Sequence, residues 1–286
     1  MVKEVIYLEE MLKGNFIIIG GHEDKKGGKD ILREVCSKID REKDELVIAT
    51  IATELPTEVG AEYRNIFEKL GVKNINILDV QDRKDACERN NIDMMEKAAL
   101  VFFTGGDQLK ITSLLGGTPL YDAIHESHKR GCVYVGTSAG ASVVCDTMII
   151  TGDDEAAPKK CTLKMAPGLG LIKNVVIDQH FSQRGRIGRL LVAIAENPES
   201  LGIGIDEDTA IMVNADGDFT AIGSGAVYVV DGSQISYTNV SEQYPDEILS
   251  MFDIKMHVLK NGDRFNLKIR QPIKEEKQDK NEDSRR

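Results

Sequence analysis

Short apolar runs alternate with amphipathic stretches along the first half of the chain. Each run is too short for a buried helix and indicates a strand covered on both faces, and the stretch after it carries apolar residues at the spacing of a helix that packs on a sheet. The expected strands cover residues 16–19, 46–51, 75–80, 99–103 and 133–135. The expected helices cover residues 30–39, 61–70, a charged region that ends near residue 97, 109–115 and 119–129. This alternation predicts a three-layer α/β/α fold, in which a doubly wound, mostly parallel sheet has helices on both faces.

The pattern changes in the second half of the chain. Residues 151–155 and 159–167 lack a regular period and indicate an excursion or lid-like loop. A β-rich C-terminal part is expected from short runs separated by Asp-Gly and Asn-Gly turns. The elements expected in this half are strands at 175–177 and 202–205, a helix at 186–196, and strand-like runs at 210–213, 227–230 and 254–259. We expect one domain over residues 1–270 and a charged, disordered tail over residues 271–286.

The ends of three expected strands should form one ligand site. In open α/β sheets, ligands bind outside the carboxyl ends of the strands. The segment after residue 19 begins with Gly20 and Gly21, the segment after residue 103 contains Gly105 and Gly106, and the segment after residue 135 contains Ser138. We expect these three loops to meet at the same edge of the sheet.

Residues 136–140 read Gly-Thr-Ser-Ala-Gly and fit the G-x-S-x-G pattern of a nucleophile elbow. A serine at the tip of a tight strand-to-helix turn has strained backbone angles and tolerates only small neighbours. Such a turn presents the Ser138 hydroxyl to the cleft, and the backbone N–H of Ala139 points toward an oxyanion formed there. The alternative is a glycine-rich turn in which Ser138 is an ordinary helix N-cap. The motif alone does not separate these two interpretations, because short motifs recur by chance.

A serine nucleophile needs a general base, and the base needs a third group that orients it. Among the five histidines, His180 is the best candidate base because it directly follows an expected strand at the same edge. His22 follows the first glycine pair, where it either lines the site or serves the loop. His125 and His128 fall on the polar face of an expected helix, where a solvated role is expected, and His257 lies in a late strand, where its role is structural.

Glu207 is the candidate for the orienting acid. It follows the expected strand at 202–205 and therefore reaches the same edge as His180. Asp206 and Asp208 compete for this role, but the alternation of side chains along an extended segment directs them away from Glu207, which favours Glu207. The alternative role for Glu207 is that of a turn carboxylate.

Three arginines, Arg184, Arg186 and Arg189, follow the candidate base and are interleaved with Gly185 and Gly188. Isolated arginines would form a solvated helix face with charge pairs. Three of them beside a catalytic edge instead indicate guanidinium groups that bind substrate carboxylates.

The composition is typical of a soluble globular enzyme or binding protein and disfavours nucleic-acid-binding, membrane-bound and disulfide-rich proteins. The 286 residues are 41% hydrophobic and 29% charged, as in an ordinary soluble domain with a sizeable core. The net charge of −11 disfavours nucleic acids and anionic membranes as partners. The N-terminus lacks a signal-peptide layout and no apolar run approaches the roughly 20 residues that cross a bilayer, so we expect a cytoplasmic protein. Five scattered cysteines without a C-x-x-C pair argue for reduced thiols and against a disulfide framework or a zinc site.

Four segments resemble the cyanophycinase family in their order and spacing. They are residues 103–108 (Phe-Thr-Gly-Gly-Asp-Gln), 136–141 (Gly-Thr-Ser-Ala-Gly-Ala), 178–189 (Asp-Gln-His-Phe-Ser-Gln-Arg-Gly-Arg-Ile-Gly-Arg) and 202–210 (Gly-Ile-Gly-Ile-Asp-Glu-Asp-Thr-Ala). The resemblance extends over about residues 16–240 and is most specific around His180. Cyanophycinases belong with dipeptidase E among serine peptidases that have a class I glutamine-amidotransferase-like fold. The resemblance therefore implies this fold, with Ser138 as nucleophile, His180 as base and Glu207 as orienting acid.

The resemblance also implies a substrate pocket and an oxyanion hole. The pocket would use Gln108, Asp178, Gln179, Arg184, Arg186 and Arg189. The N–H of Ala139 and one from Gly105 or Gly106 would hold the oxyanion. The substrate of the family is cyanophycin, a polyaspartate whose side-chain carboxyls each carry an arginine in isopeptide linkage, and cleavage of its backbone releases β-Asp-Arg dipeptides. The resemblance implies no cofactor or metal, and it implies a homodimer.

Two features depart from the family pattern. His22 stands where a small residue is expected, so the pocket should differ there. The segment beyond about Gln243 has no counterpart in the family that we can place.

Four other functions compete with this interpretation. An aspartyl dipeptidase would use the same triad, but the arginine-rich segment favours the polymer-degrading enzyme. An esterase of the α/β-hydrolase kind has its acid before its histidine, whereas the order here is Ser138, His180, Glu207. A glutamine amidotransferase needs a cysteine at the elbow. A non-catalytic binding protein would keep the fold only, and here all three candidate residues are present.

Overall fold

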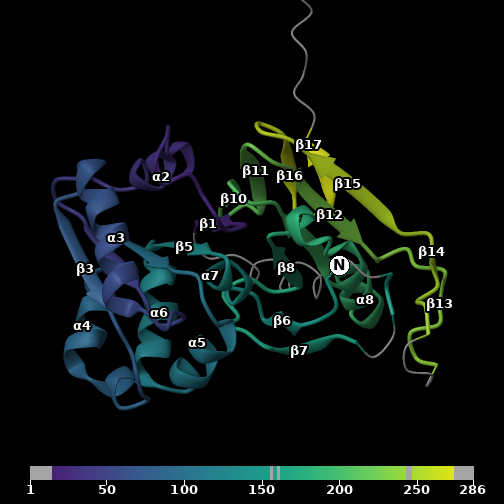
Figure 1. The fold of residues 1–286 in the computed structure, drawn as a ribbon, viewed down its shortest axis with the longest axis horizontal. Coiled ribbons are helices and arrows are strands. Elements are labelled where there is room, and N and C mark those ends of the chain that lie inside the picture. The colour runs from purple at the N-terminus through teal and green to yellow at the C-terminus, as the bar shows by residue number, and fades with distance from the viewer. Residues whose placement is uncertain (1–14, 155–156, 160–161, 243–246, 274–286) are drawn as a thin grey trace, which may run out of the picture.

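The computed structural model describes residues 15–154, 157–159, 162–242 and 247–273. Its centre is a nine-stranded sheet with the strand order β17-β16-β11-β10-β1-β5-β4-β2-β3 (Figure 1). Five neighbouring strands are parallel, namely β1 (Phe16–Ile19), β5 (Val133–Thr137), β4 (Leu100–Phe103), β2 (Glu45–Ala49) and β3 (Asn74–Leu78). The four antiparallel strands are β10 (Thr209–Val213), β11 (Asp218–Gly223), β16 (Arg264–Asn266) and β17 (Gln271–Ile273).

Helices cover both faces of the parallel strands, because alternate side chains of each strand enter different cores. Phe16 and Ile18 of β1 pack in the core that α4, α5 and α6 cover, whereas Ile17 and Ile19 pack in the core that α2 and α3 cover. The helices are α2 (Asp30–Cys36), α3 (Pro56–Lys69), α4 (Arg89–Lys97), α5 (Gln108–Leu115) and α6 (Pro119–Lys129), with a short 3-10 turn η1 (Asp85–Cys87) before α4. The predicted α/β class with helices on both faces is confirmed.

A second, four-stranded sheet with the order β15-β12-β9-β8 lies beside the first. Its strands are β8 (Val175–Gln179), β9 (Leu201–Ile205), β12 (Val227–Asp231) and β15 (Lys255–Leu259), and α8 (Ile187–Glu196) packs on it. The sequence predicts His180 and Glu207 at the edge of the same sheet as Ser138. That expectation is wrong, because both residues follow strands of the second sheet. Periodicity identifies a strand but not the sheet that it joins.

Three segments differ from the sequence-based expectations. The expected lid-like excursion contains a hairpin, in which β6 (Thr147–Thr151) pairs with β7 (Lys164–Pro167). The helix after the elbow, α7 (Ala139–Ser142), is one short turn. The strand β17 lies within the residues expected as the tail, while the rest of that segment, 274–286, lies outside the described residues, so the disorder of the tail stays a prediction.

Two minor strands, β13 (Tyr237–Thr238) and β14 (Met251–Phe252), complete the β-rich C-terminal part that the turn pattern predicts. Figure 1 shows this part in green and yellow on the side of the molecule opposite α3 and α4. Within the part of the chain that the structure describes, no helix is both long and apolar enough to span a bilayer.

Candidate active site

The elbow around Ser138 is a strained turn between β5 and α7. Ser138 has a φ of 53°, in the region that L-residues other than glycine rarely adopt. A Cβ at Gly136 would lie 2.1 Å from the carbonyl oxygen of Gly140, and a Cβ at Gly140 would lie 2.4 Å from that of Phe103. Both glycines are therefore required by the close approach of backbone. The Ser138 side chain makes no capping bond to α7, which disfavours the N-cap interpretation.

Three consecutive carbonyl groups at the end of β1 hold the three candidate catalytic segments. The backbone N–H of Ser138 donates to the carbonyl of Ile19 at 3.1 Å, and that of His180 donates to the carbonyl of Gly20 at 2.8 Å. The next carbonyl, of Gly21, accepts from the N–H of Asp208 at 2.9 Å, beside Glu207. The segment 19–21 thus joins the two sheets at the site, and we call it the β1 seam.

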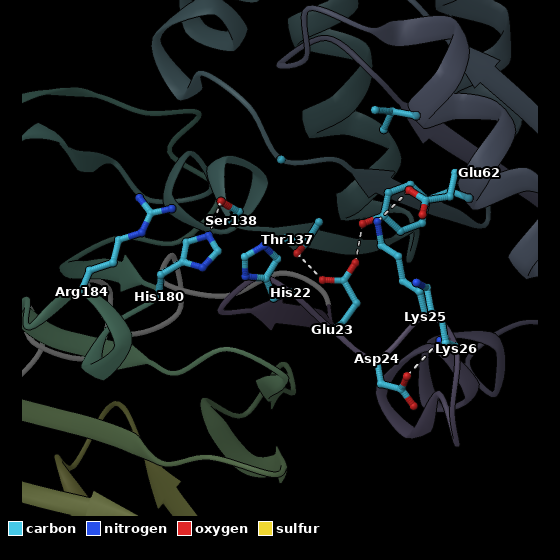
Figure 2. Close-up of a pocket in the computed structure, with 13 residues that line it drawn as sticks. His22, Glu23, Asp24, Lys25, Lys26, Glu62, Thr137, Ser138, His180 and Arg184 are labelled. Carbon is cyan, nitrogen blue, oxygen red and sulfur yellow. Dashed lines mark hydrogen bonds and ion pairs between the residues drawn. The ribbon is translucent and has the colours of Figure 1, made fainter.

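The β1 seam brings the side chains of Ser138, His180 and Glu207 into a hydrogen-bonded chain. Ser138 Oγ lies 3.0 Å from His180 Nε2, and His180 Nδ1 lies 2.7 Å from Glu207 Oε1 (Figure 2 shows the first pair). The imidazole packs directly on Gly21, where a Cβ would lie 2.3 Å from His180 Cε1. This contact explains why residue 21 is a glycine, since a side chain there would collide with the imidazole. The three residues that the sequence predicts are together, and their catalytic roles stay a prediction.

The two competing acids have other partners. Asp206 accepts hydrogen bonds from the backbone N–H groups of Ser182 and Ala226, at 2.9 and 3.1 Å. Asp208 accepts one from the N–H of Asp24 at 2.9 Å. Both carboxylates therefore fix loops around the site, and Glu207 is the acid that contacts the imidazole, as the alternation argument favours.

Burial and charge shift the pKa values of the base and the acid. Burial lowers the pKa of His180 below its usual value, and the neighbouring Arg184 acts in the same direction, although the hydrogen bond to Glu207 opposes both. Burial alone would raise the pKa of Glu207, but the hydrogen bonds from His180 and His22 lower it overall. The site therefore favours a neutral imidazole beside an ionised carboxylate.

His22, whose role the sequence leaves open, belongs to the site. Its Nδ1 lies 2.6 Å from Glu207 Oε1, the same oxygen that His180 contacts. Its ring centre lies 5.1 Å from that of His180, in an edge-to-face arrangement, and 72% of its side chain is exposed. His22 thus lies beside His180 among the residues that line the pocket (Figure 2).

A pocket of about 500 Å³ opens beside Ser138 and extends toward α3. Glu23 is buried on its wall, where it accepts a hydrogen bond from Thr137 Oγ1 at 2.7 Å and another from the hydroxyl of Tyr63. Lys25 lies over the Tyr63 ring, 4.2 Å from its centre. The sequence patterns do not identify these wall residues. The run of charged residues directly after Gly20 and Gly21 is the signal that marks them.

Two of the three candidate oxyanion donors, Ala139 and Gly105, lie next to the nucleophile. Ala139 begins α7, so its N–H lies at the N-terminus of that turn. A Cβ at Gly105 would lie 3.7 Å from Ser138 Oγ, so this loop passes directly beside the hydroxyl. Gly106, with a φ of 143°, packs instead on the carbonyl of Ala52. The assignment of Ala139, Gly105 and Gly106 to an oxyanion hole stays a prediction.

The predicted substrate-binding arginines divide into two groups. Arg184 lies on the pocket wall, in the short 3-10 turn η2 (Ser182–Arg184), and makes no ion pair with any described residue. Arg186 and Arg189 are buried in an ionic cluster with Asp178, Gln179 and Asp154, at distances of 2.6–3.5 Å apart from one shorter contact between Arg189 and Asp178. Their direct contact with substrate stays a prediction.

The remaining candidate residues have partners other than Ser138. Gln108 Nε2 donates to the carbonyl of Ile149 at 2.9 Å and so ties α5 to β6. His128 is buried with its Nδ1 2.9 Å from the carbonyl of Cys132, so the expected solvated role is wrong for this residue. His125 is partly buried against the carbonyl of Leu169, and His257 packs on Phe265.

The chain is similar in sequence to several cyanophycinases and, over part of its length, to a peptidase E. The cyanophycinase of Geminocystis herdmanii is 39% identical over 267 residues, 93% of this chain and 98% of that protein. The cyanophycinase of a Nostoc species is 39% identical over 88% of this chain and 85% of its own length. A peptidase E from a Nostoc species is 28% identical over 48% of this chain.

Two solved structures share the fold. A peptidase from an acI-B1 Actinobacterium superposes with a TM-score of 0.63 at 20% identity, covering 91% of this chain and 99% of its own. A putative peptidase E from Listeria monocytogenes superposes with a TM-score of 0.51 at 14% identity, covering 75% of this chain. The model of peptidase family S51 matches residues 16–221, which include Ser138, His180 and Glu207. The chain belongs to peptidase family S51.

Proposed function

We propose that this protein is a serine peptidase that hydrolyses the backbone of cyanophycin to β-Asp-Arg dipeptides. The observation that carries the proposal is the hydrogen-bonded chain from Ser138 through His180 to Glu207 at the mouth of a pocket. Relatives that are 39% identical over most of the chain and are named cyanophycinase support the choice of substrate.

In the proposed mechanism, Ser138 attacks the backbone carbonyl while His180 Nε2 takes the hydroxyl proton. Glu207 holds the imidazole in the tautomer with its proton on Nδ1 and stabilises the imidazolium that forms. The N–H of Ala139 and one from Gly105 or Gly106 hold the oxyanion, and each such donor contributes about 3–4 kcal/mol in other serine hydrolases. His180 then protonates the leaving amine, and water attacks the resulting ester of Ser138.

The charged groups around the site suit a substrate with carboxylates and a guanidinium. Arg184, which faces the pocket, is positioned to bind a substrate carboxylate bidentately. We propose that Arg186 and Arg189 use N–H donors left by their internal pairs for a second carboxylate, and that Asp178 and Gln179 set the orientation of these two arginines. Gln108 completes this substrate-binding set.

Replacement of the nucleophile tests the proposal directly. Ser138→Ala removes the attacking oxygen, so we expect kcat for cyanophycin to fall at least about 1,000-fold, as in other triad enzymes. The assay is a cyanophycin digest followed by mass analysis of the products, with β-Asp-Arg expected from the wild type. Ser113→Ala, at an exposed serine on α5, is the matched control.

Two results would contradict the proposal. Unchanged activity of Ser138→Ala would show that the hydroxyl is not the nucleophile. Cleavage of Asp-initiated dipeptides to free aspartate, without action on cyanophycin, would identify an aspartyl dipeptidase instead, the activity suggested by the more distant peptidase E relative.

We also propose that the protein acts as a homodimer in the cytoplasm, with no nucleic acid or membrane as partner. The net charge of −11 supports the second part of this proposal. Light scattering of the purified protein measures the oligomeric state.

A further inference from the structure

His22, His180 and Glu207 form a cluster of three metal-ligand side chains. One ligand atom from each lies within 4.8 Å of the other two. Both imidazoles direct Nδ1 at the same oxygen, Glu207 Oε1, at 2.6 and 2.7 Å. Two imidazoles and a carboxylate are a ligand set that zinc hydrolases use, with a fourth position left for water.

We propose that Zn²⁺ binds at this corner of the site and switches the enzyme off. The ion takes the Nδ1 lone pairs of the neutral imidazoles of His22 and His180 and one oxygen of Glu207, and the single ring proton of each imidazole transfers from Nδ1 to Nε2 by exchange with solvent. Zinc–ligand bonds of about 2.0–2.2 Å in tetrahedral geometry place the donor atoms about 3.3 Å apart. Each Nδ1 atom therefore lies about 0.6 Å farther from Glu207 Oε1 than in the present hydrogen-bonded arrangement.

The exposure of the cluster allows both entry and adjustment. The side chain of His22 is 72% exposed and that of Glu207 is 28% exposed, whereas that of His180 is only 6% exposed. The buried imidazole is the fixed ligand, held by its backbone on the β1 seam and by Gly21 beneath the ring. The side chains of His22 and Glu207 face solvent, so they can shift to reach zinc-ligand distances without a change in the backbone.

Zinc on Nδ1 reverses the roles of the two nitrogens of His180. In the active arrangement, Nδ1 carries the proton and donates to Glu207, so Nε2 accepts the proton of Ser138. When the metal occupies Nδ1, the ring proton resides on Nε2, which then donates to Ser138 Oγ and cannot accept its proton. The ion therefore blocks the base without covering the nucleophile.

His22 decides the affinity of this site. Without it, only His180 and Glu207 remain, a pair that any serine-histidine-acid site offers. His22 supplies the third ligand, and its replacement tests the site without removing Ser138, His180 or Glu207. Mg²⁺ should not bind, because it prefers octahedral oxygen ligands.

The first experiment measures zinc binding without turnover. ZnCl₂ is titrated into Ser138→Ala, which keeps all three ligands, and isothermal calorimetry gives the affinity and stoichiometry. We expect one ion per chain, and at least tenfold weaker binding when His22→Asn is added, because asparagine tolerates the left-handed backbone at this position (φ 46°) but lacks the imidazole. Adding His125→Gln instead, on α6, should leave the affinity unchanged.

The second experiment measures inhibition of cyanophycin hydrolysis. Zn²⁺ should lower kcat, EDTA should restore it, Mg²⁺ should have no effect, and His22→Asn should need at least ten times more Zn²⁺ for half-inhibition. The inhibition rests on the proposed function, whereas the binding does not.

Zinc binding that is equally tight with and without His22, or absent from Ser138→Ala, would overturn the proposal. Tight His22-dependent binding to a protein that never cleaves cyanophycin would support the metal site and refute only the proposed function.

Discussion

Three residues of the candidate site, His22, Ser138 and His180, have φ values between 46° and 53°. Each such conformation costs a non-glycine residue about 1–3 kcal/mol, so the surrounding structure must hold it in place. The β1 seam supplies that hold at Ser138 and His180 through backbone hydrogen bonds to Ile19 and Gly20. Backbone strain at the residues that carry the proposed chemistry indicates a preorganised site.

The pH profile of kcat/KM reports the state of His180. Because burial lowers the pKa of this imidazole, the acid limb should have its midpoint below about 6.5, the usual value for histidine. Arg184→Gln removes a positive charge that disfavours the imidazolium, so the pKa of His180 should rise and the midpoint should move to higher pH. Arg83→Gln, whose guanidinium binds carbonyls near the end of α5, is the control. A midpoint that stays in place or falls in Arg184→Gln would contradict this account.

At the scale of single residues, the sequence predicts the side chains that follow a strand but not their partners. Ser138, His180 and Glu207 each come directly after a recognisable strand, so their meeting can be anticipated. Glu23 becomes a wall of the pocket only through Thr137, 114 positions away. The pairing of Arg189 with Asp178 likewise depends on where β8 and α8 pack, which no local pattern contains.

The ionic cluster between β8 and α8 should support the second sheet. Asp178 is buried beneath Arg186 and Arg189, so Asp178→Asn leaves two buried guanidinium groups with less compensating charge. We expect the free energy of unfolding in urea to fall by about 3–5 kcal/mol. Asp218→Asn, which breaks a more exposed pair with Arg264, should cost no more than about 1 kcal/mol. Equal losses in the two variants would mean that the cluster does not stabilise the fold.

At the scale of elements, apolar runs predict the parallel strands well because both faces of those strands are buried. The helix α3 begins at Pro56, before the expected start at residue 61, and the proline at its first turn is the signal that marks this start. The β6–β7 hairpin is missed because its strands are joined by a long connection without a tight-turn motif. Packing between distant elements decides that β8 and β9 join the second sheet, so the periodicity of these strands cannot predict it.

The proposed single domain can be tested at its C-terminal boundary. Removal of residues 274–286 should leave one cooperative thermal transition, with a Tm within about 2 °C of the full chain, because this segment contains no apolar residue. Removal of residues 271–286 also deletes β17, which pairs with β16 at the edge of the nine-stranded sheet, and should lower the Tm by several degrees more. Circular dichroism melting curves of the two truncations decide the point. Equal Tm values, or two separate transitions, would refute the boundary or the single domain.

The β1 seam has a consequence for the molecule as a whole. The alcohol belongs to one sheet, whereas the imidazole and the carboxylate belong to the other, and three successive peptide carbonyls join them. The distance between Ser138 Oγ and His180 Nε2 is therefore set by main-chain hydrogen bonds at the β1 seam. A change that separates the two sheets would therefore abolish the proposed activity, even though Ser138, His180 and Glu207 were all still present.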